Sequence, residues 1–112
     1  MSDQVRQAAA NEAVFRQVNE EIESLERGRA QVSDNHMHIV CECADADCAE
    51  MLVVPIAEYE GIRRDATLFF VKPGHEILSL EDVVGEGSTY SVVRKHPGEG
   101  RRLAKRSDPR SA

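Results

Sequence analysis

Hydrophobic positions in the first part of the chain repeat with the period of an α-helix. Counted from the alanine at position 8, they follow at spacings of seven, three, four and three residues. Such spacing forms one apolar stripe along a helix. The stripe consists of Ala8, Phe15, Val18, Ile22 and Leu25. Because helix-favouring residues fill the other positions, the pattern predicts one helix from about Asp3 to Arg29, followed by a turn at residues 33–35.

Beyond residue 35 the pattern changes to short β-prone runs separated by turn residues. The predicted strands are residues 37–42, 51–56, 67–72, 82–84 and 90–95. Residues 57–64 have the length of two helical turns, and Arg63-Arg64 would compensate the dipole at the end of this short helix. The last two strands flank a glycine-containing loop, which is typical of a β-hairpin. The sequence predicts an α+β fold, with a long N-terminal helix followed by a small, mainly antiparallel sheet with a short inserted helix.

Length and charge indicate one domain with three parts. A chain of 112 residues that is 41% apolar is long enough for one core. The predicted parts are a helix and turn over residues 1–35, an α+β core over 36–96 and a tail over 97–112. The tail carries five basic and two acidic side chains, and its Pro, Gly and Ser content predicts disorder. Residues 1–96 carry 9 basic and 18 acidic side chains, so only the tail would attract nucleic acid.

Two further expectations concern the location of the protein. No apolar run approaches the length of about 18 residues that a membrane span requires. The first 35 residues carry charges throughout, unlike a signal peptide. We therefore expect a cytoplasmic protein without a membrane span.

The three cysteines of the chain lie within eight residues, in the spacing C-x-C-x4-C. On a strand, Cys41 and Cys43 point to the same face because the side-chain period is two. A loop after Cys43 would return Cys48 to that face. Three converging thiolates provide most of a tetrahedral site for a soft metal, and zinc is the expected occupant. Two other interpretations stay open, namely inert buried thiols and redox or disulfide chemistry.

A fourth ligand would come from a histidine. His75 follows the turn-forming sequence Lys72-Pro73-Gly74, which would hold its side chain rigidly. His36 and His38 are close to Cys41 in the sequence, but an offset of three residues on a regular strand turns His38 away from Cys41. We therefore favour His75, with His36 and His38 as alternatives.

Several motifs together resemble a family of small, uncharacterised bacterial proteins. The segments that carry the resemblance are Cys41-Glu42-Cys43 with Cys48, residues 58–63, residues 70–76 and residues 90–93. They are similar to the family patterns C-E-C-G-x3-C, E-Y-E-x-V-R, F-x-V-x-P-G-H-E and Y-x-V-V. The resemblance covers about Phe15 to Lys95.

This resemblance implies that Cys41, Cys43, Cys48 and His75 belong to one zinc site. The chain departs from the family at two positions that affect local turn geometry. Ala44 stands where the pattern has glycine, and Pro55 stands where a helix-capping threonine is usual. Because no activity is attached to the family, the resemblance implies a zinc site but no biochemical activity or biological process.

These features predict a non-enzymatic interaction or regulatory module with a structural zinc ion. Three thiolates and a histidine would close the coordination shell and make the metal a poor Lewis acid. The chain has no phosphate-binding loop, nucleophile elbow or H-E-x-x-H helix, so we assign no catalytic or cofactor-binding residue. For a catalytic metal, the candidate general bases would be Glu42, Asp45, Asp47 and Glu76.

The expected partner is another protein or a second copy of the chain. It would bind through four residues of the helix stripe, Phe15, Val18, Ile22 and Leu25. Packing of this stripe against the protein's own sheet is the other interpretation. The alternative function is a nucleic-acid-associated zinc protein that uses the basic tail over residues 97–112. A metal- or thiol-dependent enzyme is the least favoured class.

Overall fold

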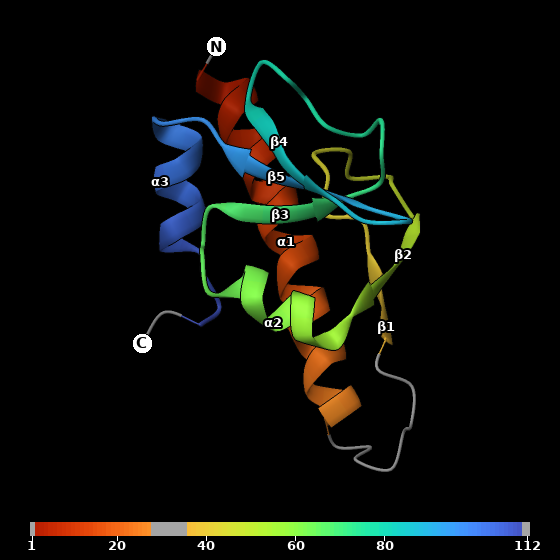
Figure 1. Cartoon of the computed structure of the whole chain (residues 1–112). Helices are drawn as coiled ribbons and strands as arrows, with labels where there is room; N and C mark the ends of the chain where they lie inside the picture. Colours follow the sequence, from red (N-terminus) through yellow and green to blue (C-terminus); the bar gives the residue numbers. More distant parts are fainter. Residues whose placement is uncertain (1, 28–35, 111–112) are drawn as a thin grey trace.

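The computed structural model describes residues 2–27 and 36–110. It contains, in chain order, α1 (Ser2–Arg27), β1 (His36–Val40), β2 (Met51–Pro55), α2 (Ile56–Arg63), β3 (Leu68–Val71), β4 (Glu81–Glu86), β5 (Ser91–Lys95) and α3 (Glu99–Arg106). The predicted α+β class with a long N-terminal helix is confirmed (Figure 1). None of the helices in these two ranges combines the length and apolar character needed to cross a membrane.

The strands form two antiparallel sheets instead of the single sheet predicted. β1 pairs with β2, and the other sheet has the strand order β3-β5-β4. The predicted hairpin of the last two strands is confirmed, with a register shift between Val83 and Gly85 of β4. Beyond β1, the amide of Glu42 donates to the carbonyl of Phe70 in β3 at 2.7 Å. The chain thus leaves one sheet and joins the other at the cysteine-containing segment.

Two clusters of buried side chains meet at β3, which is buried on both faces. Leu68 and Phe70 belong to a cluster with the inward residues of β1 and β2, whereas Phe69 and Val71 belong to a cluster with Cys41 and Cys43. The alternation of side chains along a strand explains this division. One face of β3 therefore supports the aliphatic and aromatic core, and the other supports the cysteines.

α2 is fixed by the two residues that it buries, Tyr59 and Arg63. The Tyr59 ring stacks on Phe70, with ring centroids 5.6 Å apart. Pro55 precedes the helix without a side-chain capping hydrogen bond, at the position where the resembling family has threonine. Because Arg63 points into the protein, the prediction that it only compensates the helix dipole is wrong.

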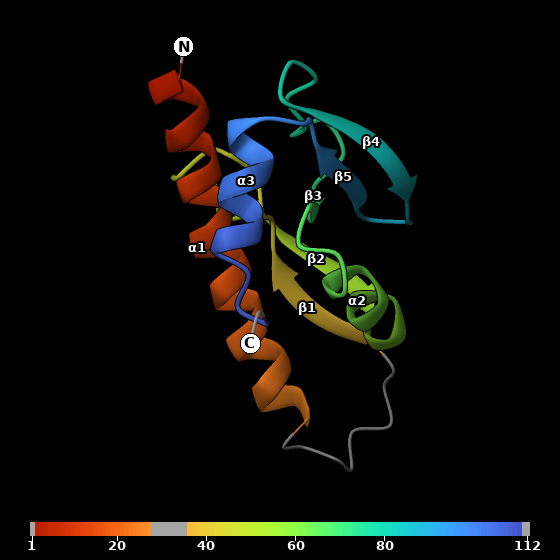
Figure 2. The ribbon, with the colours of Figure 1, turned by 90° about the vertical axis from the view of Figure 1, so that its left-hand side faces the viewer.

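The buried face of α1 is mostly polar, which the sequence pattern did not predict. Its buried residues are Ala8, Ala9, Glu12, Arg16, Asn19 and Glu23. Of the predicted apolar stripe, Ile22 packs against the core and Phe15 is half-buried. Val18 and Leu25 are 40% and 69% exposed. The stripe is therefore only partly a packing surface, and polar contacts hold much of the helix to the rest of the protein. Figure 2 shows α1 running beside α3 and β1.

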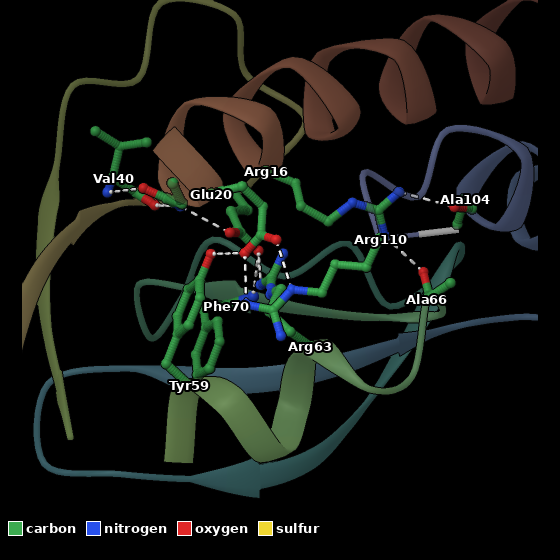
Figure 3. A network of polar contacts seen from close by, with 11 residues as sticks. Arg16, Glu20, Val40, Tyr59, Arg63, Ala66, Phe70, Ala104 and Arg110 are labelled. Atoms are coloured by element: carbon green, nitrogen blue, oxygen red, sulfur yellow. Dashed lines mark hydrogen bonds and ion pairs between the residues drawn. The ribbon is translucent and has the colours of Figure 1, made fainter. Parts of the chain in front are cut away.

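Arg16 shows how a charged residue holds α1 in place. Its guanidinium donates to the carbonyls of Ala66 and Ala104, each at 2.7 Å (Figure 3). The same group lies 4.6 Å from the centroid of the Phe69 ring. These contacts connect α1 to α3 and to the start of β3, and they offset the cost of burying the charge.

Residues 97–110 are not the disordered tail that their composition predicted. α3 lies along α1, and Ala104 of α3 is buried in the cluster that contains Phe69 and Val71. The Arg101 side chain donates to the carbonyl of Lys95, and Arg110 donates to both Glu20 and Glu60. The basic residues order this segment through partners that are distant in the sequence, so local composition did not reveal them.

A buried ion triad joins α1 to the second sheet. The Lys95 ammonium lies 2.9 Å from a Glu12 carboxylate oxygen and 3.1 Å from an oxygen of Glu81. Two carboxylates thus share one ammonium in the protein interior. Burial raises the pKa of Glu12 to about 7, although the attraction of Lys95 opposes this change.

The pKa of Glu12 predicts how stability depends on pH. Because the folded pKa lies above the usual value of 4.5, the favourable contribution of protonated Glu12 is lost as pH rises from 4.5 to about 7. Gln cannot ionise, so the unfolding free energy of Glu12→Gln should rise relative to wild type by up to about 3 kcal/mol over this range. Urea unfolding at several pH values measures it. Glu21→Gln, at an exposed position, is the matched control. A pH-independent difference between Glu12→Gln and wild type would contradict the raised pKa of Glu12.

Candidate metal centre

The structure brings the four predicted ligands together. One ligand atom from each of Cys41, Cys43, Cys48 and His75 lies within 4.8 Å of the others. Nδ1 of His75 is 3.6 Å from Sγ of Cys41 and 3.6 Å from Sγ of Cys48. In a tetrahedral zinc site, bond lengths of about 2.0–2.3 Å separate the ligand atoms by roughly 3.5–4 Å. The cluster therefore has the dimensions of a metal site.

Two of the cysteines are positioned by an extension of β1. The Cys41 amide donates to the carbonyl of Glu50 at 2.9 Å, which continues the β1–β2 pairing by one residue. The loop then turns at Asp45, whose side chain accepts from the Asp47 amide and whose carbonyl accepts from the Cys48 amide. This local turn returns Cys48 to the two sulfurs, as the short polar loop predicts.

A tight turn after β3 positions His75. The His75 amide donates to the carbonyl of Lys72 at 2.9 Å, closing a turn with Pro73 and Gly74 at its centre. Gly74 has a φ of +95°, a conformation that favours glycine. The Lys72 amide donates to Sγ of Cys41 at 3.2 Å. This hydrogen bond links the turn that carries His75 to the segment that carries Cys41.

The alternative histidines lie elsewhere. His36 and His38 are exposed on β1, whereas Met37 and Ile39 between and beside them are buried. His38 therefore faces away from the sulfur atoms, as its odd offset from Cys41 predicts. In the ranges that the structure describes, the group that could hold a metal ion contains His75 and not these two residues.

The environment of the sulfurs suits a cation. Burial raises the pKa of the Cys41 and Cys43 thiols above the ordinary value. The neighbouring sulfurs raise the pKa of Cys41 further, because adjacent thiolates repel one another. A metal ion would replace these protons and neutralise the negative charge. Three sulfur donors and one imidazole fit a soft or borderline metal ion.

Glu42, between two ligand cysteines, points into the protein instead of toward the cluster. Its carboxylate accepts from Arg63 at 2.6 Å, from the Phe70 amide at 2.9 Å and from the Asn19 side chain at 2.7 Å. The carboxylate is fully buried and engaged. Its prediction as a candidate general base is therefore wrong. Figure 3 shows Arg63 beside Tyr59 and Phe70 in this region.

Asn19 of α1 holds the strand that leads to the cluster. Its side-chain oxygen accepts from the Val40 amide, and its side-chain nitrogen donates to the Val40 carbonyl, both at 2.8 Å. The roles of Asn19, Glu42 and Arg63 were missed in the sequence. A charged residue between two buried cysteines is a signal for Glu42, and the four-residue spacing of Tyr59 and Arg63 places them on one helix face.

The other acidic residues differ from Glu42 in their surroundings. Asp45 and Asp47 are exposed on the loop between the cysteines. Glu76 is half-buried and accepts from the Gly74 amide at 2.9 Å. Hydrogen bonds within their own turns account for Asp45 and Glu76, so these carboxylates shape the ligand-bearing loops.

Loss of the Glu42 charge should destabilise the fold. Glu42→Gln leaves the Arg63 guanidinium without its counter-ion in the interior, which should lower the unfolding free energy by about 3–5 kcal/mol. Urea denaturation measures this. Glu50→Gln removes the carboxylate of an exposed pair with Lys72 and should change stability little. Equal stabilities for the two variants would show that the buried ion pair is not required.

Metal retention should distinguish the histidines. His75→Ala removes one of four ligands, so metal bound after dialysis should fall by at least about tenfold. His96→Ala is the control, because His96 pairs with Asp82 outside the cluster. Elemental analysis of both variants measures retention. Metal loss on substitution of His36 or His38, with His75→Ala unaffected, would reassign the fourth ligand.

Known proteins do not extend this description. Comparisons of the chain with models of protein families, with curated proteins and with solved structures find no match. The family resemblance noted from the sequence motifs stays a prediction.

Proposed function

We propose that the protein is a small zinc-stabilised interaction module in which the metal has a structural role. The observation that carries this proposal is the convergence of Cys41, Cys43, Cys48 and His75. A set of three thiolates and one imidazole is typical of structural zinc, with four protein ligands and no open position. The unpaired thiols suit a reducing compartment such as the cytoplasm.

The position of the ligands in the fold supports a structural role. Cys41 and Cys43 follow β1 of one sheet, whereas His75 follows β3 of the other. A metal ion held by both segments would connect the two sheets across a sequence separation of 34 residues. Such a connection reduces the entropy of the unfolded chain, so part of the metal-binding free energy becomes folding free energy.

The surroundings of the cluster favour a structural metal over catalysis. Three thiolates donate enough negative charge to weaken a zinc ion as a Lewis acid. Glu42, which lies between two of the ligands in the sequence, is paired with Arg63 in the interior. We therefore propose that the protein is not an enzyme and that it acts by binding another molecule.

A protein partner has more support than nucleic acid. Of the basic side chains in residues 97–112, Arg101 donates to a backbone carbonyl and Arg110 to two carboxylates. These contacts engage two of the charges on which nucleic-acid binding through this segment would depend. On α1, Val18 and Leu25 are exposed apolar residues of the stripe that the sequence predicts as a protein-binding surface.

Removal of the metal tests the structural role. The purified protein should contain about one zinc ion per chain, and a strong chelator should lower the melting temperature by roughly 10 °C or more. Amide exchange should increase over residues 39–75, while α1 partly persists. Circular dichroism and amide exchange measure these changes.

The control for this experiment is the same chelator saturated with zinc, which should have no effect. Two outcomes would contradict the proposal. One is protein that contains no metal and is fully folded, and the other is an unchanged melting curve after verified removal of the zinc.

A further inference from the structure

A cleft of about 560 Å³ lies beside the candidate metal centre. One wall is the beginning of α1, and the other is the segment that follows His75, between β3 and β4. Figure 1 shows this segment turning back at the end of the molecule where α1 begins. The volume lies within the range of about 300–1,000 Å³ that is typical of ligand-binding pockets.

The cleft is physically connected to the metal ligands. Ala44, which lines it, directly follows Cys43, and Ile77 is two residues beyond His75. The Asn11 side chain of α1 donates to the carbonyl of Ala44 at 2.7 Å. A metal ion that holds Cys43 and His75 would therefore also hold two sides of the cleft in position.

The side chains around the cleft favour an aliphatic occupant. Most of the lining is apolar and comprises Val5, Ala8, Ala44, Ile77 and Leu80. Leu78, next to two lining residues in the sequence, is 67% exposed. Burial of aliphatic side chains from a partner would remove this apolar surface from water.

The charges next to the lining residues are mainly negative. Asp45 and Glu76 adjoin Ala44 and Ile77 in the sequence, and both are at least partly exposed. Asp82, two residues beyond Leu80, is exposed and faces His96 at 3.0 Å. The nearest basic residue in the sequence, Arg6, is paired with Glu99 at 3.0 Å. Among the sequence neighbours of the lining residues, exposed carboxylates thus outnumber basic side chains, which favours a positively charged partner.

A second copy of the chain is a poor match for this rim. Its exposed apolar residues on α1, Val14, Val18 and Leu25, are accompanied by the exposed Glu21. The chain as a whole has a net charge of −6. Repulsion between like charges would oppose docking of one copy into the cleft of another.

We propose that this cleft binds a basic segment of a partner protein, which inserts aliphatic side chains between α1 and residues 76–80. This inference rests on the proposed function as an interaction module and specifies its binding surface. Aliphatic burial provides the anchor, and the carboxylates at the rim select positive charge. Zinc keeps the walls of the cleft in register.

Synthetic peptides of equal length test the two parts of this proposal. One alternates leucine with lysine, a second alternates leucine with glutamate, and a third alternates serine with lysine. The leucine–lysine peptide should bind the zinc-loaded full chain at least about tenfold more tightly than either of the others. Its affinity should also fall as salt is added, because the rim charges are exposed. Calorimetry measures affinity, and amide chemical shifts locate the site.

Two arginine variants provide matched chains for the same titration. Ser79→Arg introduces a long, positively charged side chain at an exposed residue that lines the cleft. It should therefore lower the affinity for the leucine–lysine peptide by at least about tenfold. Ser88→Arg adds the same charge on an exposed loop away from the lining and should bind like wild type. Zinc content and melting temperature of both variants confirm that they are folded.

The failures of the two proposals are distinguishable. The cleft is not the binding site if zinc-loaded, folded protein does not bind the leucine–lysine peptide, or if Ser79→Arg binds it as well as wild type does. Either result leaves the proposal of a structural zinc ion unaffected. Equal binding of the serine–lysine peptide would show that aliphatic side chains do not anchor the partner. Chemical-shift changes confined to Val14, Val18 and Leu25 would place the peptide-binding surface on the exposed side of α1 instead of in the cleft. Protein that folds without metal overturns the proposed function itself.

Discussion

The alternation of side chains along residues 41–43 is the constraint on which the rest of the structure depends. Cys41 and Cys43 point to one face of this extended segment, and Glu42 points to the other. The sulfurs meet Cys48 and His75, whereas the carboxylate meets Arg63. Both sheets and two helices thereby contact a segment of three residues. A shift of one residue in its register would exchange the two faces and place a carboxylate among the thiols.

Polar contacts in the interior determine how α1 is placed. Asn19 pairs with the backbone of Val40, Arg16 with two carbonyls, and Glu12 with Lys95. Burial of charged groups is costly, and replacement by apolar residues is often neutral or stabilising in other proteins. In this protein the buried polar contacts of α1 provide specificity, because each hydrogen bond forms only at one rotation and one position of the helix. An apolar stripe alone would allow the helix to slide or turn.

Much of the fold and the ligand set followed from local sequence patterns. Helical and β periodicities located α1, α2 and the strands to within a few residues. The cysteine spacing singled out Cys41, Cys43 and Cys48, and the Pro-Gly turn favoured His75 over His36 and His38. These patterns report short-range geometry. The polar face of α1, the order in residues 99–106 and the Glu42–Arg63 pair depend on partners far away in the sequence. Hydropathy treats such charges as surface, so the apolar stripe did not reveal the polar face through which α1 makes much of its contact.

X-ray absorption at the zinc edge tests most directly whether the four side chains bind a metal ion, because it reports the atoms bound to the metal. For protein purified with zinc, we expect three sulfur neighbours at about 2.3 Å and one nitrogen neighbour at about 2.0–2.1 Å. The histidine contribution should disappear in His75→Ala and persist in His96→Ala. A first shell of nitrogen and oxygen without sulfur would contradict the assignment of the cluster as a metal centre.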